Sequence, residues 1–586
     1  MVAMIKRWVG STQILKRKDN TMTDEYDAIV VGSGAAGAST AYEMINAGMK
    51  VLILEKGPER SLQDFQESGV FGSTFKGSGR GDELKFINEE YLMPDRKEEI
   101  RFLEYSDIYG NQKKTGRTTY GWMSQLVGGG TVHYGGASFR FEESDFKMRT
   151  KFKHIAETLE SKIGISQSYS ADLYDWPIEY KEFSKWYALA EKRIGIAASP
   201  SSDLPPLPFN SASIQIMKGL SNYQNGNIKL LSTPMAINSS NHLNRSPCHH
   251  SGLCQDFACR YEAKSDMRVT LLREAQKTGR LTIQSNTFVR KIHKENSTVK
   301  SLECLIGDPN KNPKITYISA PIFVIGCEAM ETNRLLLASK IGNKDVLGKY
   351  IMFHMTGGAR SIATKNKTNT WKIAPHTAYI DAFYHDFSHG EKAFLKTGVF
   401  LVSSNGGPLQ ASSGIWGNRA LRYFNEVYPY KMDLSYIGDA MPVSSNKIEL
   451  VNELDSYGMQ GTKITYQPHI FDHNAAIYMQ KRATEILKAS EGITYDSTSD
   501  KTLKSFLKKE PTAHRLFHAC GGCRMGKDPK YSVVDENCKL HNIDNLYITD
   551  ASVFPTSSGK NPTLTIQANA MRIGHHIAMK YLKRNP

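Results

Sequence analysis

The apolar positions near the N-terminus follow the order of a strand, a helix and a second strand. Ala28–Val31 is a short apolar run, as expected for a strand buried on both faces of a parallel sheet. Ala35–Ala47 carries small and apolar residues at helical spacing, and Gly48 is a stop signal for the helix. Val51–Leu54 is a second apolar run. The pattern therefore predicts a βαβ unit of about 30 residues.

The loop between the first strand and the helix has the glycine pattern G-x-G-x-x-G. In such a unit the first glycine permits a tight turn, the second lets backbone approach a pyrophosphate, and the third lets the helix pack closely on the strand. The helix N-terminus then offers free N–H groups and a partial positive charge to the phosphates. Glu55, directly after the second strand, can accept hydrogen bonds from ribose hydroxyls. The combination predicts a dinucleotide site and does not separate NAD from FAD. The residues expected to bind the cofactor here are Gly32, Gly34, Ala35, Ala36, Gly37, Glu55 and Lys56.

A second glycine-rich stretch, Gly121–Arg140, contains six glycines and is otherwise largely apolar. That density disfavours both a helix and an ordinary strand. It is typical of backbone that approaches a flat or phosphorylated ligand, and a tight structural turn is the alternative. His133 is the ionisable side chain near its centre.

The middle of the chain contains patterns of both structural types. Leu281–Ile292 indicates one strand or two, and Pro321–Gly326 indicates a buried strand, followed by a helix over Glu331–Ser339. Stretches of His376–Leu450 alternate apolar and polar residues, with Tyr, Phe and Trp among them, which favours an antiparallel sheet. Asp472–Ala489 indicates a further helix.

The C-terminal region repeats the order of strand, loop and helix. Leu546–Thr549 predicts a strand that ends at Asp550, and Ser557–Asn561 is a turn-rich loop. Pro562–Ile577 predicts a helix, with the proline at a permitted first-turn position. The loop therefore leads into a helix N-terminus, a second place to hold an anionic or carbonyl-like group.

A histidine and an asparagine in this region suit alcohol oxidation. His518 begins the segment HACGGCRMG, and Asn561 ends the turn-rich loop. An imidazole can take a hydroxyl proton near neutral pH. An amide can donate to a developing alkoxide or orient the substrate. For a single histidine considered alone, a structural role is the commoner one.

Composition narrows the class of protein. The chain has 586 residues, 40% of them hydrophobic, which suggests two domains or one elaborated domain. Part of the formal net charge of +15 lies in the first 20 residues and the rest is dispersed, which disfavours a nucleic-acid ligand. Docking to an acidic partner or an anionic membrane surface stays open.

The sequence contains no clear signal for membrane insertion or secretion. No apolar run reaches the roughly 18 residues of a transmembrane helix, and the N-terminus lacks the apolar core of a secretory signal. Met1–Asn20 is expected to be a basic tail or the product of an upstream start codon rather than a short targeting peptide. Eight cysteines are few for this length and indicate a reducing compartment. We therefore expect a cytoplasmic protein, which a partner can hold at a membrane.

Three of the cysteines are clustered, at Cys248, Cys254 and Cys259. The spacing is equally that of a loop with ordinary thiols. A zinc site would need a fourth ligand, which His249 or His250 can supply. Three thiolates can also hold an iron–sulfur cluster.

Together these segments resemble the glucose–methanol–choline (GMC) oxidoreductases. The resemblance rests on the βαβ unit, the stretch VGGGTVH, the strand and helix FVIGCEAMETNRLLL, and the C-terminal segment NLYITDASVFPTSSGKNPTLTIQA. It spans both ends of the chain. Within the family, the pyranose oxidases and the large subunits of gluconate, fructose and glucose dehydrogenases look nearest, because His518 precedes Arg524-Met525-Gly526 and His133 follows Gly128–Gly130.

The resemblance implies an α/β fold with two domains. One is a doubly wound, Rossmann-like FAD-binding domain assembled from separate segments, expected at residues 24–150, 226–345 and 511–586. The other is a substrate domain built on an antiparallel sheet, expected at residues 151–225 and 346–510.

The resemblance also implies roles for individual residues. By motif position His518 is the catalytic base, and Asn561 is the partner that is His or Asn in relatives. In pyranose oxidases a histidine near the place of His133 carries covalent FAD, and a noncovalent contact is the alternative here. The three clustered cysteines resemble the triplet that holds a 3Fe–4S cluster in the glucose dehydrogenase branch, with a last gap one residue longer. The further residues expected to contact FAD are Val127, Gly128, Gly129, His133, Val289, Asp550, Ala551, Asn561, Pro562 and Thr563.

These inferences predict an FAD-dependent oxidoreductase that oxidises a CH–OH group of a sugar, an amino sugar or a polyol. His518 is expected to take the hydroxyl proton while hydride goes to flavin N5. A quinone, a haem or an iron–sulfur partner is preferred over dioxygen as the electron acceptor, and an oxidase that produces hydrogen peroxide is the alternative. Two other classes stay open: a non-redox lyase of the hydroxynitrile-lyase kind on the same fold, and a non-catalytic electron-transfer or binding subunit.

Overall fold

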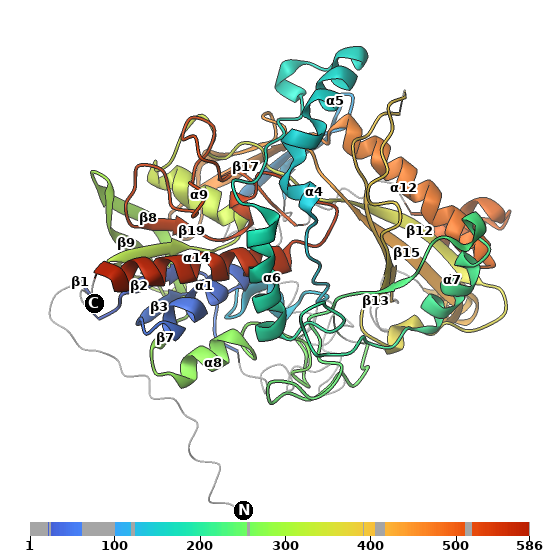
Figure 1. Cartoon of the computed structure of the whole chain (residues 1–586), viewed down its shortest axis with the longest axis horizontal. Coiled ribbons are helices and arrows are strands. Elements are labelled where there is room, and N and C mark those ends of the chain that lie inside the picture. The colour runs from blue at the N-terminus through green and yellow to red at the C-terminus, as the bar shows by residue number, and fades with distance from the viewer. Residues whose placement is uncertain are drawn as a thin grey trace, which may run out of the picture.

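The computed structural model describes most of the chain (Figure 1). The described residues are 21–22, 25–60, 100–118, 124–252, 254, 258–390, 392–404, 416–509 and 518–584. The tail Met1–Asn20 and the first three residues of the second glycine-rich stretch lie outside the described residues.

A five-stranded parallel sheet forms the centre of the nucleotide-binding part. Its strand order is β19-β11-β2-β3-β7, so the first strand of the βαβ unit lies in the middle. β2 and β3 are buried at every position, which explains their uninterrupted apolar sequence. The five strands are β2 (Ala28–Val31), β3 (Val51–Leu54), β7 (Leu281–Gln284), β11 (Ile322–Ile325) and β19 (Leu546–Ile548).

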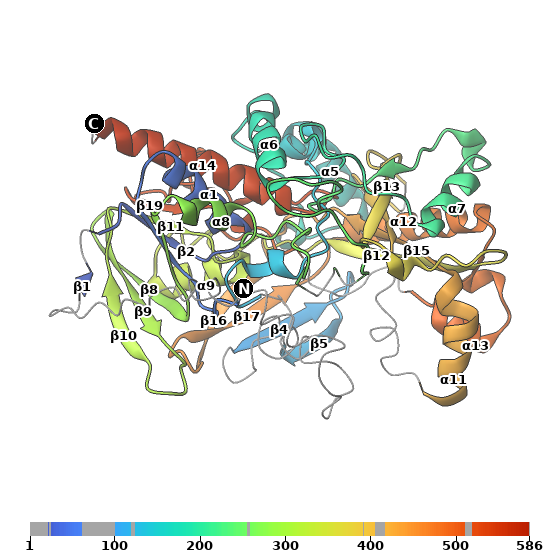
Figure 2. The same ribbon diagram turned by 90° about the horizontal axis from the view of Figure 1, so that it is seen from below.

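Helices cover one side of this sheet and a second sheet covers the other (Figure 2). Helix α1 packs against α14 and α8, and α14 also contacts α6. On the opposite side lies a four-stranded sheet of order β1-β10-β9-β8, whose apolar side chains join the same hydrophobic core. These elements are α1 (Ala35–Asn46), α6 (Tyr180–Ile194), α8 (Leu271–Lys277), α14 (Thr563–Arg584), β1 (Thr21–Met22), β8 (Thr287–Glu295), β9 (Thr298–Ile306) and β10 (Lys314–Ile318).

A six-stranded antiparallel sheet forms the other half of the molecule. Its order is β18-β12-β15-β14-β13-β6. The long helix α12 packs on β12 and β15, and α7 packs on α12. These elements are α7 (Ser211–Leu220), β6 (Leu231–Ser232), β12 (Met355–Ala363), β13 (His376–Ile380), β14 (Gly398–Ser403), β15 (Lys431–Gly438), α12 (Ile470–Ala489) and β18 (Gly492–Thr494).

A smaller sheet of order β16-β17-β4-β5 lies beside these layers. Its central pair, β17 and β4, is parallel, and the outer pairs are antiparallel. Helix α9, which follows β11, contacts both β8 and β16 and so links this sheet to the nucleotide-binding part. The remaining strands and α-helices are β4 (Arg101–Ser106), β5 (Gln112–Arg117), α4 (Glu143–Phe146), α5 (Met148–Ile163), α9 (Ala329–Ser339), α11 (Gly417–Arg422), β16 (Lys447–Leu454), β17 (Gln460–Tyr466) and α13 (Lys501–Leu507).

The α/β fold with one parallel and one antiparallel sheet is confirmed. The region Leu281–Ile292 contains two strands, β7 and the start of β8. The C-terminal helix is longer than its apolar pattern predicts, because polar residues such as His575 occupy its exposed face without ending it. The domain boundaries themselves stay a prediction. In the described part of the chain, no helix is both long and apolar enough to cross a membrane.

We expect Gly37→Ala to destabilise the protein, because the added Cβ would lie 1.9 Å from the backbone oxygen of Gly32. Overpacking against immobile backbone should lower the free energy of unfolding by about 3 kcal/mol. Denaturant unfolding followed by circular dichroism measures this. Gly390→Ala is the control, since nothing lies within 4 Å of its added Cβ. Equal stability of the two variants would contradict the close packing of helix on strand.

Candidate active site

The first glycine loop, between β2 and α1, is crowded by backbone. Gly32 has a φ of +92°, and a Cβ there would lie 2.6 Å from the oxygen of Gly326, which follows β11. Gly37 lies against the oxygen of Gly32, as described above. The two glycines therefore allow the tight turn and the close contact of helix and strand that the sequence pattern predicts.

The N-terminus of α1 is arranged to receive an anion. Gly34 is its N-cap residue, no side chain caps the helix, and the first turn contains no acidic residue. Ala35 and Ala36 begin the helix and add no bulk over its end. The N–H groups and the positive end of the helix dipole are thus left for a ligand such as a pyrophosphate.

Glu55 fixes the conformation of this loop. Its buried carboxylate accepts hydrogen bonds from the backbone N–H (3.0 Å) and the hydroxyl (2.6 Å) of Ser33, and from the N–H of Gly57 (2.9 Å). Burial raises its pKa. Because a carboxylate can accept about four hydrogen bonds, these contacts leave capacity for a ribose hydroxyl. The ammonium group of Lys56 lies over the ring of Tyr457, 4.4 Å from its centroid.

The two glycine-rich stretches meet in space. The N–H of Gly128 donates to the hydroxyl of Ser33 (2.9 Å), and a Cβ on Gly129 would lie 2.9 Å from the Cα of Gly34. Both Gly128 and Gly129 have positive φ. Val127, which precedes them, is buried. The second stretch therefore lies directly on the first loop, as expected if both bind one cofactor.

His133 ends the short turn after these glycines and is 3% exposed. Its Nδ1 lies 3.2 Å from the hydroxyl of Ser124, while its buried Nε2 has no hydrogen-bond partner among the described residues. Burial lowers its pKa to about 3, and the charges of Lys264 and Arg268 act in the same direction. This side chain is therefore neutral at physiological pH.

Strand β8 begins beside Glu55, because the N–H of Thr287 donates to the Glu55 backbone oxygen (2.9 Å). Val289, expected near the adenine, is buried two residues further along this strand. Asp550 follows β19 and is also buried, and its carboxylate accepts hydrogen bonds from the hydroxyl of Thr332 and the N–H of Ser552. Burial raises the pKa of Asp550.

His518 is paired with a second histidine, His354. Their Nδ1 atoms lie 2.9 Å apart, and the two rings meet edge to face. Burial lowers the pKa of each to about 3. His518 has a φ of +55°, an uncommon conformation that histidine tolerates better than most residues. The pair therefore consists of two neutral imidazoles.

Asn561 lies on the loop between β19 and α14. Its Oδ1 is buried and has no hydrogen-bond partner among the described residues. Pro562 and Thr563 follow, and α14 begins at Thr563. The segment of His518 is held beside the start of this loop, since the N–H of Gly521 donates to the backbone oxygen of Ala551 (3.0 Å). Both predicted catalytic residues thus lie on neighbouring segments.

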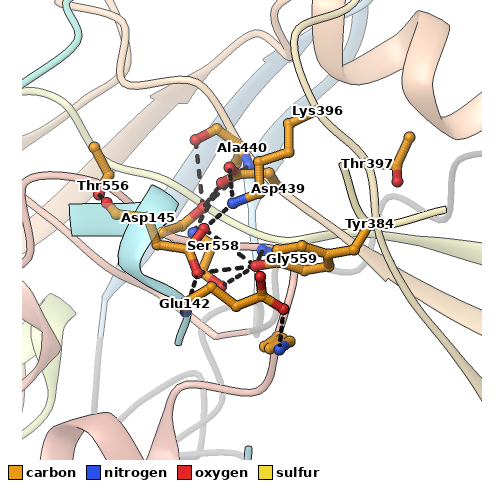
Figure 3. Close-up of polar contacts among 12 residues, drawn as sticks. Glu142, Asp145, Tyr384, Lys396, Thr397, Asp439, Ala440, Thr556, Ser558 and Gly559 are labelled. Carbon is orange, nitrogen blue, oxygen red and sulfur yellow. Dashed lines mark hydrogen bonds and ion pairs between the residues drawn. The ribbon is translucent and has the colours of Figure 1, made fainter. Parts of the chain in front are cut away.

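A buried network of charges holds the Asn561 loop (Figure 3). The fully buried ammonium group of Lys396 forms ion pairs with Asp145 and, at 3.6 Å, with Asp439. One carboxylate oxygen of Asp439 also accepts hydrogen bonds from the hydroxyl of Ser557 (2.7 Å) and the N–H of Ser558 (2.8 Å). The charge that neutralises the lysine therefore also fixes the turn three residues before Asn561.

Tyr384 ties the same turn to the second carboxylate. Its hydroxyl donates to Asp145 (2.9 Å) and lies 2.9 Å from the hydroxyl of Ser558. The N–H of Gly559 donates to this hydroxyl oxygen (3.3 Å). Gly559 has no room for a side chain, because a Cβ would lie 2.4 Å from the Cα of Gly398. The loop is thus restrained on both sides.

The structure gives no support for the 3Fe–4S site that the resemblance implies for the cysteine triplet. In the described part of the chain, no group of three or more His, Cys, Asp or Glu side chains is arranged to hold a metal ion. Burial raises the pKa of Cys248, and raises that of Cys254 to about 12. The ammonium of Lys264 donates to the Cys254 backbone oxygen (2.6 Å).

Sequence reasoning missed the residues that support the site, namely His354, Tyr384, Lys396, Asp145 and Asp439. His354 precedes β12 and belongs to no recognisable motif. Lys396 carried a usable signal, because it stands alone as a charge in the apolar segment AFLKTGVF. A lysine in such a run is expected to be paired inside the protein.

The geometry fits a bound FAD. The bare N-terminus of α1 suits a pyrophosphate, and the two touching glycine loops give a cradle that side chains would fill. The buried Nε2 of His133 and Oδ1 of Asn561 have no hydrogen-bond partner among the described residues, and a flavin ring or a substrate can supply one.

Comparison with known proteins agrees with an FAD-binding site. Two models described as GMC oxidoreductase match residues 213–356 and 442–570, and a model described as FAD binding domain matches residues 27–82. The chain is 25% identical to 6'''-hydroxyparomomycin C oxidase of Streptomyces lividus, covering 94% of this chain and 91% of the relative. It is 24% identical to paromamine 6'-oxidase of Streptomyces fradiae (96% and 92%) and 23% identical to the gluconate 2-dehydrogenase flavoprotein of Pantoea cypripedii (96% and 94%).

Solved structures show the same fold. The crystal structure of pyridoxine 4-oxidase from Mesorbium loti matches with a TM-score of 0.59 at 17% identity, covering 94% of this chain and 99% of that one. Formate oxidase matches with a TM-score of 0.60 at 13% identity, covering 95% and 99%. This chain belongs to the GMC oxidoreductase family, as an FAD-dependent enzyme that acts on CH–OH groups.

Proposed function

We propose that this enzyme oxidises a hydroxyl group of a sugar, an amino sugar or a related polyol to a carbonyl group. The observation that carries the proposal is the neutral, half-buried imidazole of His518, on a segment adjacent to the loop of Asn561. The reaction removes a proton from the hydroxyl oxygen and a hydride from its carbon. Bound FAD supplies the acceptor for the hydride.

His518 takes the hydroxyl proton. Because its pKa is lowered to about 3, its ring nitrogen is unprotonated before the reaction and available as a base. Asn561 orients the substrate oxygen through its side-chain amide.

The substrate class is supported by the names of the relatives. Two are named as oxidases of 6'''-hydroxyparomomycin C and paromamine, and others as dehydrogenases of gluconate and fructose. All four compounds are polyhydroxylated and related to carbohydrates. A polyhydroxylated substrate is therefore the best-supported class for this chain.

For the electron acceptor we propose a quinone or a haem partner. The net charge of +15 favours association with an acidic partner. The cysteine triplet, which pointed to an iron–sulfur acceptor, no longer contributes to this argument. Dioxygen is the second candidate, and the two relatives named as oxidases favour it.

His518→Ala is expected to slow reduction of the bound FAD by about 10²- to 10⁴-fold, the usual contribution of a general base. Flavin absorbance after anaerobic mixing with paromamine, gluconate, fructose or glucose measures this rate. A retained flavin spectrum shows that the variant still binds FAD. An unchanged rate would exclude His518 as the base, and a wild-type flavin that stays oxidised with a substrate that is nevertheless consumed would indicate a lyase.

The pH dependence of rate and stability should differ. Because the pKa of His518 is about 3 in the folded protein, the rate of flavin reduction should show no loss near pH 6.5 and should fall only near pH 3 to 4. Stability behaves differently, since His133, His354 and His518 take up protons only when unfolded. The free energy of unfolding should therefore decrease as the pH falls below about 6.5. A rate that halves near pH 6.5 would show that His518 is exposed to solvent.

Parallel assays with the same substrate identify the preferred electron acceptor. We expect turnover with a soluble ubiquinone analogue to exceed turnover with air-saturated buffer by at least about tenfold. Oxygen consumption and hydrogen peroxide formation are measured beside quinone reduction. Faster turnover with dioxygen, with one peroxide formed per carbonyl, would make the enzyme an oxidase.

A further inference from the structure

The backbone pairing places His354 and His518 opposite each other. Met352 and Cys520 exchange two backbone hydrogen bonds, of 2.9 and 3.0 Å, as an isolated antiparallel bridge. In such a pairing, the residue two positions after Met352 lies opposite the residue two positions before Cys520. The register therefore sets His354 against His518, and the 2.9 Å contact of their Nδ1 atoms follows from it.

A hydrogen bond between two Nδ1 atoms has a defined direction. One ring must carry its proton on Nδ1 and donate, and the other must have a bare Nδ1 and accept. If His518 is the base and acts through Nε2, its proton is on Nδ1, so His354 is the acceptor. His354 then carries its own proton on Nε2, a buried atom that has no hydrogen-bond partner among the described residues.

We propose that His354 is a positioning residue that fixes the tautomer and orientation of His518, an inference that rests on the proposed role of His518 as base. The arrangement resembles that of a base held by a carboxylate, with a neutral imidazole in the place of the anion. The turn at Ser558 links the pair to the loop of Asn561, because Ser558 is also held by Asp439 and Tyr384.

The environment keeps this pair uncharged. Cys520 lies beside the pair, and its Sγ donates to the His518 backbone oxygen (3.3 Å). Burial raises the pKa of that thiol, so it stays protonated and neutral. A neutral thiol adds no negative charge that would favour protonated His518.

Three variants of the holoenzyme separate the contributions of His354. His354→Leu removes the acceptor, and we expect flavin reduction to slow by about 10²- to 10⁴-fold. His354→Asn places a side-chain oxygen near the position of Nδ1, and we expect the rate to stay within about tenfold of wild type. His354→Asp adds a charge, which favours protonated His518 and moves the acid limb of the rate to higher pH. Rates are measured with whichever of the four substrates above reduces the wild-type flavin.

His469→Leu is the matched control, since it also removes a fully buried imidazole, one that caps α12. We expect it to lower stability and to leave the rate of flavin reduction within about twofold. Equal losses in His354→Leu and His469→Leu, or no rescue by His354→Asn, would reduce His354 to a packing role and overturn the proposal.

The tautomer of His518 can be measured by ¹⁵N NMR without any turnover of substrate. In holoenzyme labelled with ¹⁵N only in histidine, the signals of His518 are those lost in His518→Asn. We expect them to show the proton on Nδ1 in the wild type and in His354→Asn, and a mixture of tautomers in His354→Leu. A proton on Nε2 in the wild type would overturn the proposal. Failure of all four substrates to reduce the flavin would count against the proposed function alone.

Discussion

A buried ammonium group must be neutralised inside the fold, and Lys396 obtains its two carboxylates from distant parts of the chain. Each ion in such a cluster costs several kcal/mol to desolvate, so the arrangement persists only when the remaining lone pairs are also satisfied. Asp439 accepts hydrogen bonds from Ser557 and Ser558 at Oδ1, and Asp145 accepts one from Tyr384. The uncommon backbone of Ser558, with a φ of +95°, is held by these contacts. The position of Asn561 thus depends on charges that never touch the substrate.

The site binds phosphates and removes a proton through different electrostatic environments. At α1, backbone N–H groups and the helix dipole offer positive potential, which suits phosphates. At the reacting end, His518 and His354 are neutral because burial penalises their charged forms. The anion-binding region thus depends on backbone dipoles, whereas the base depends on desolvation to stay unprotonated.

Local patterns were enough to predict the nucleotide-binding unit, because the apolar runs of β2 and β3 and the spacing of Gly32, Gly34 and Gly37 are set by neighbouring residues. Family resemblance placed His518 and Asn561 on their segments. Neither source identified His354, since its role comes from the register between Met352 and Cys520, which are far apart in sequence. The spacing of the cysteine triplet gives only proximity along the chain, and among the described residues these side chains are not arranged as a metal site.

The edge strand β19 and the helix α14 come from the last part of the chain, yet they pack on β11 and α1 of the first glycine unit. During synthesis, the N-terminal glycine loop therefore emerges long before the elements that complete its sheet and cover its helix. A polypeptide that stops before residue 546 lacks this edge strand, this helix and Asn561 together. A chain of that length therefore lacks, at once, an edge of the nucleotide-binding sheet and a residue with a predicted catalytic role.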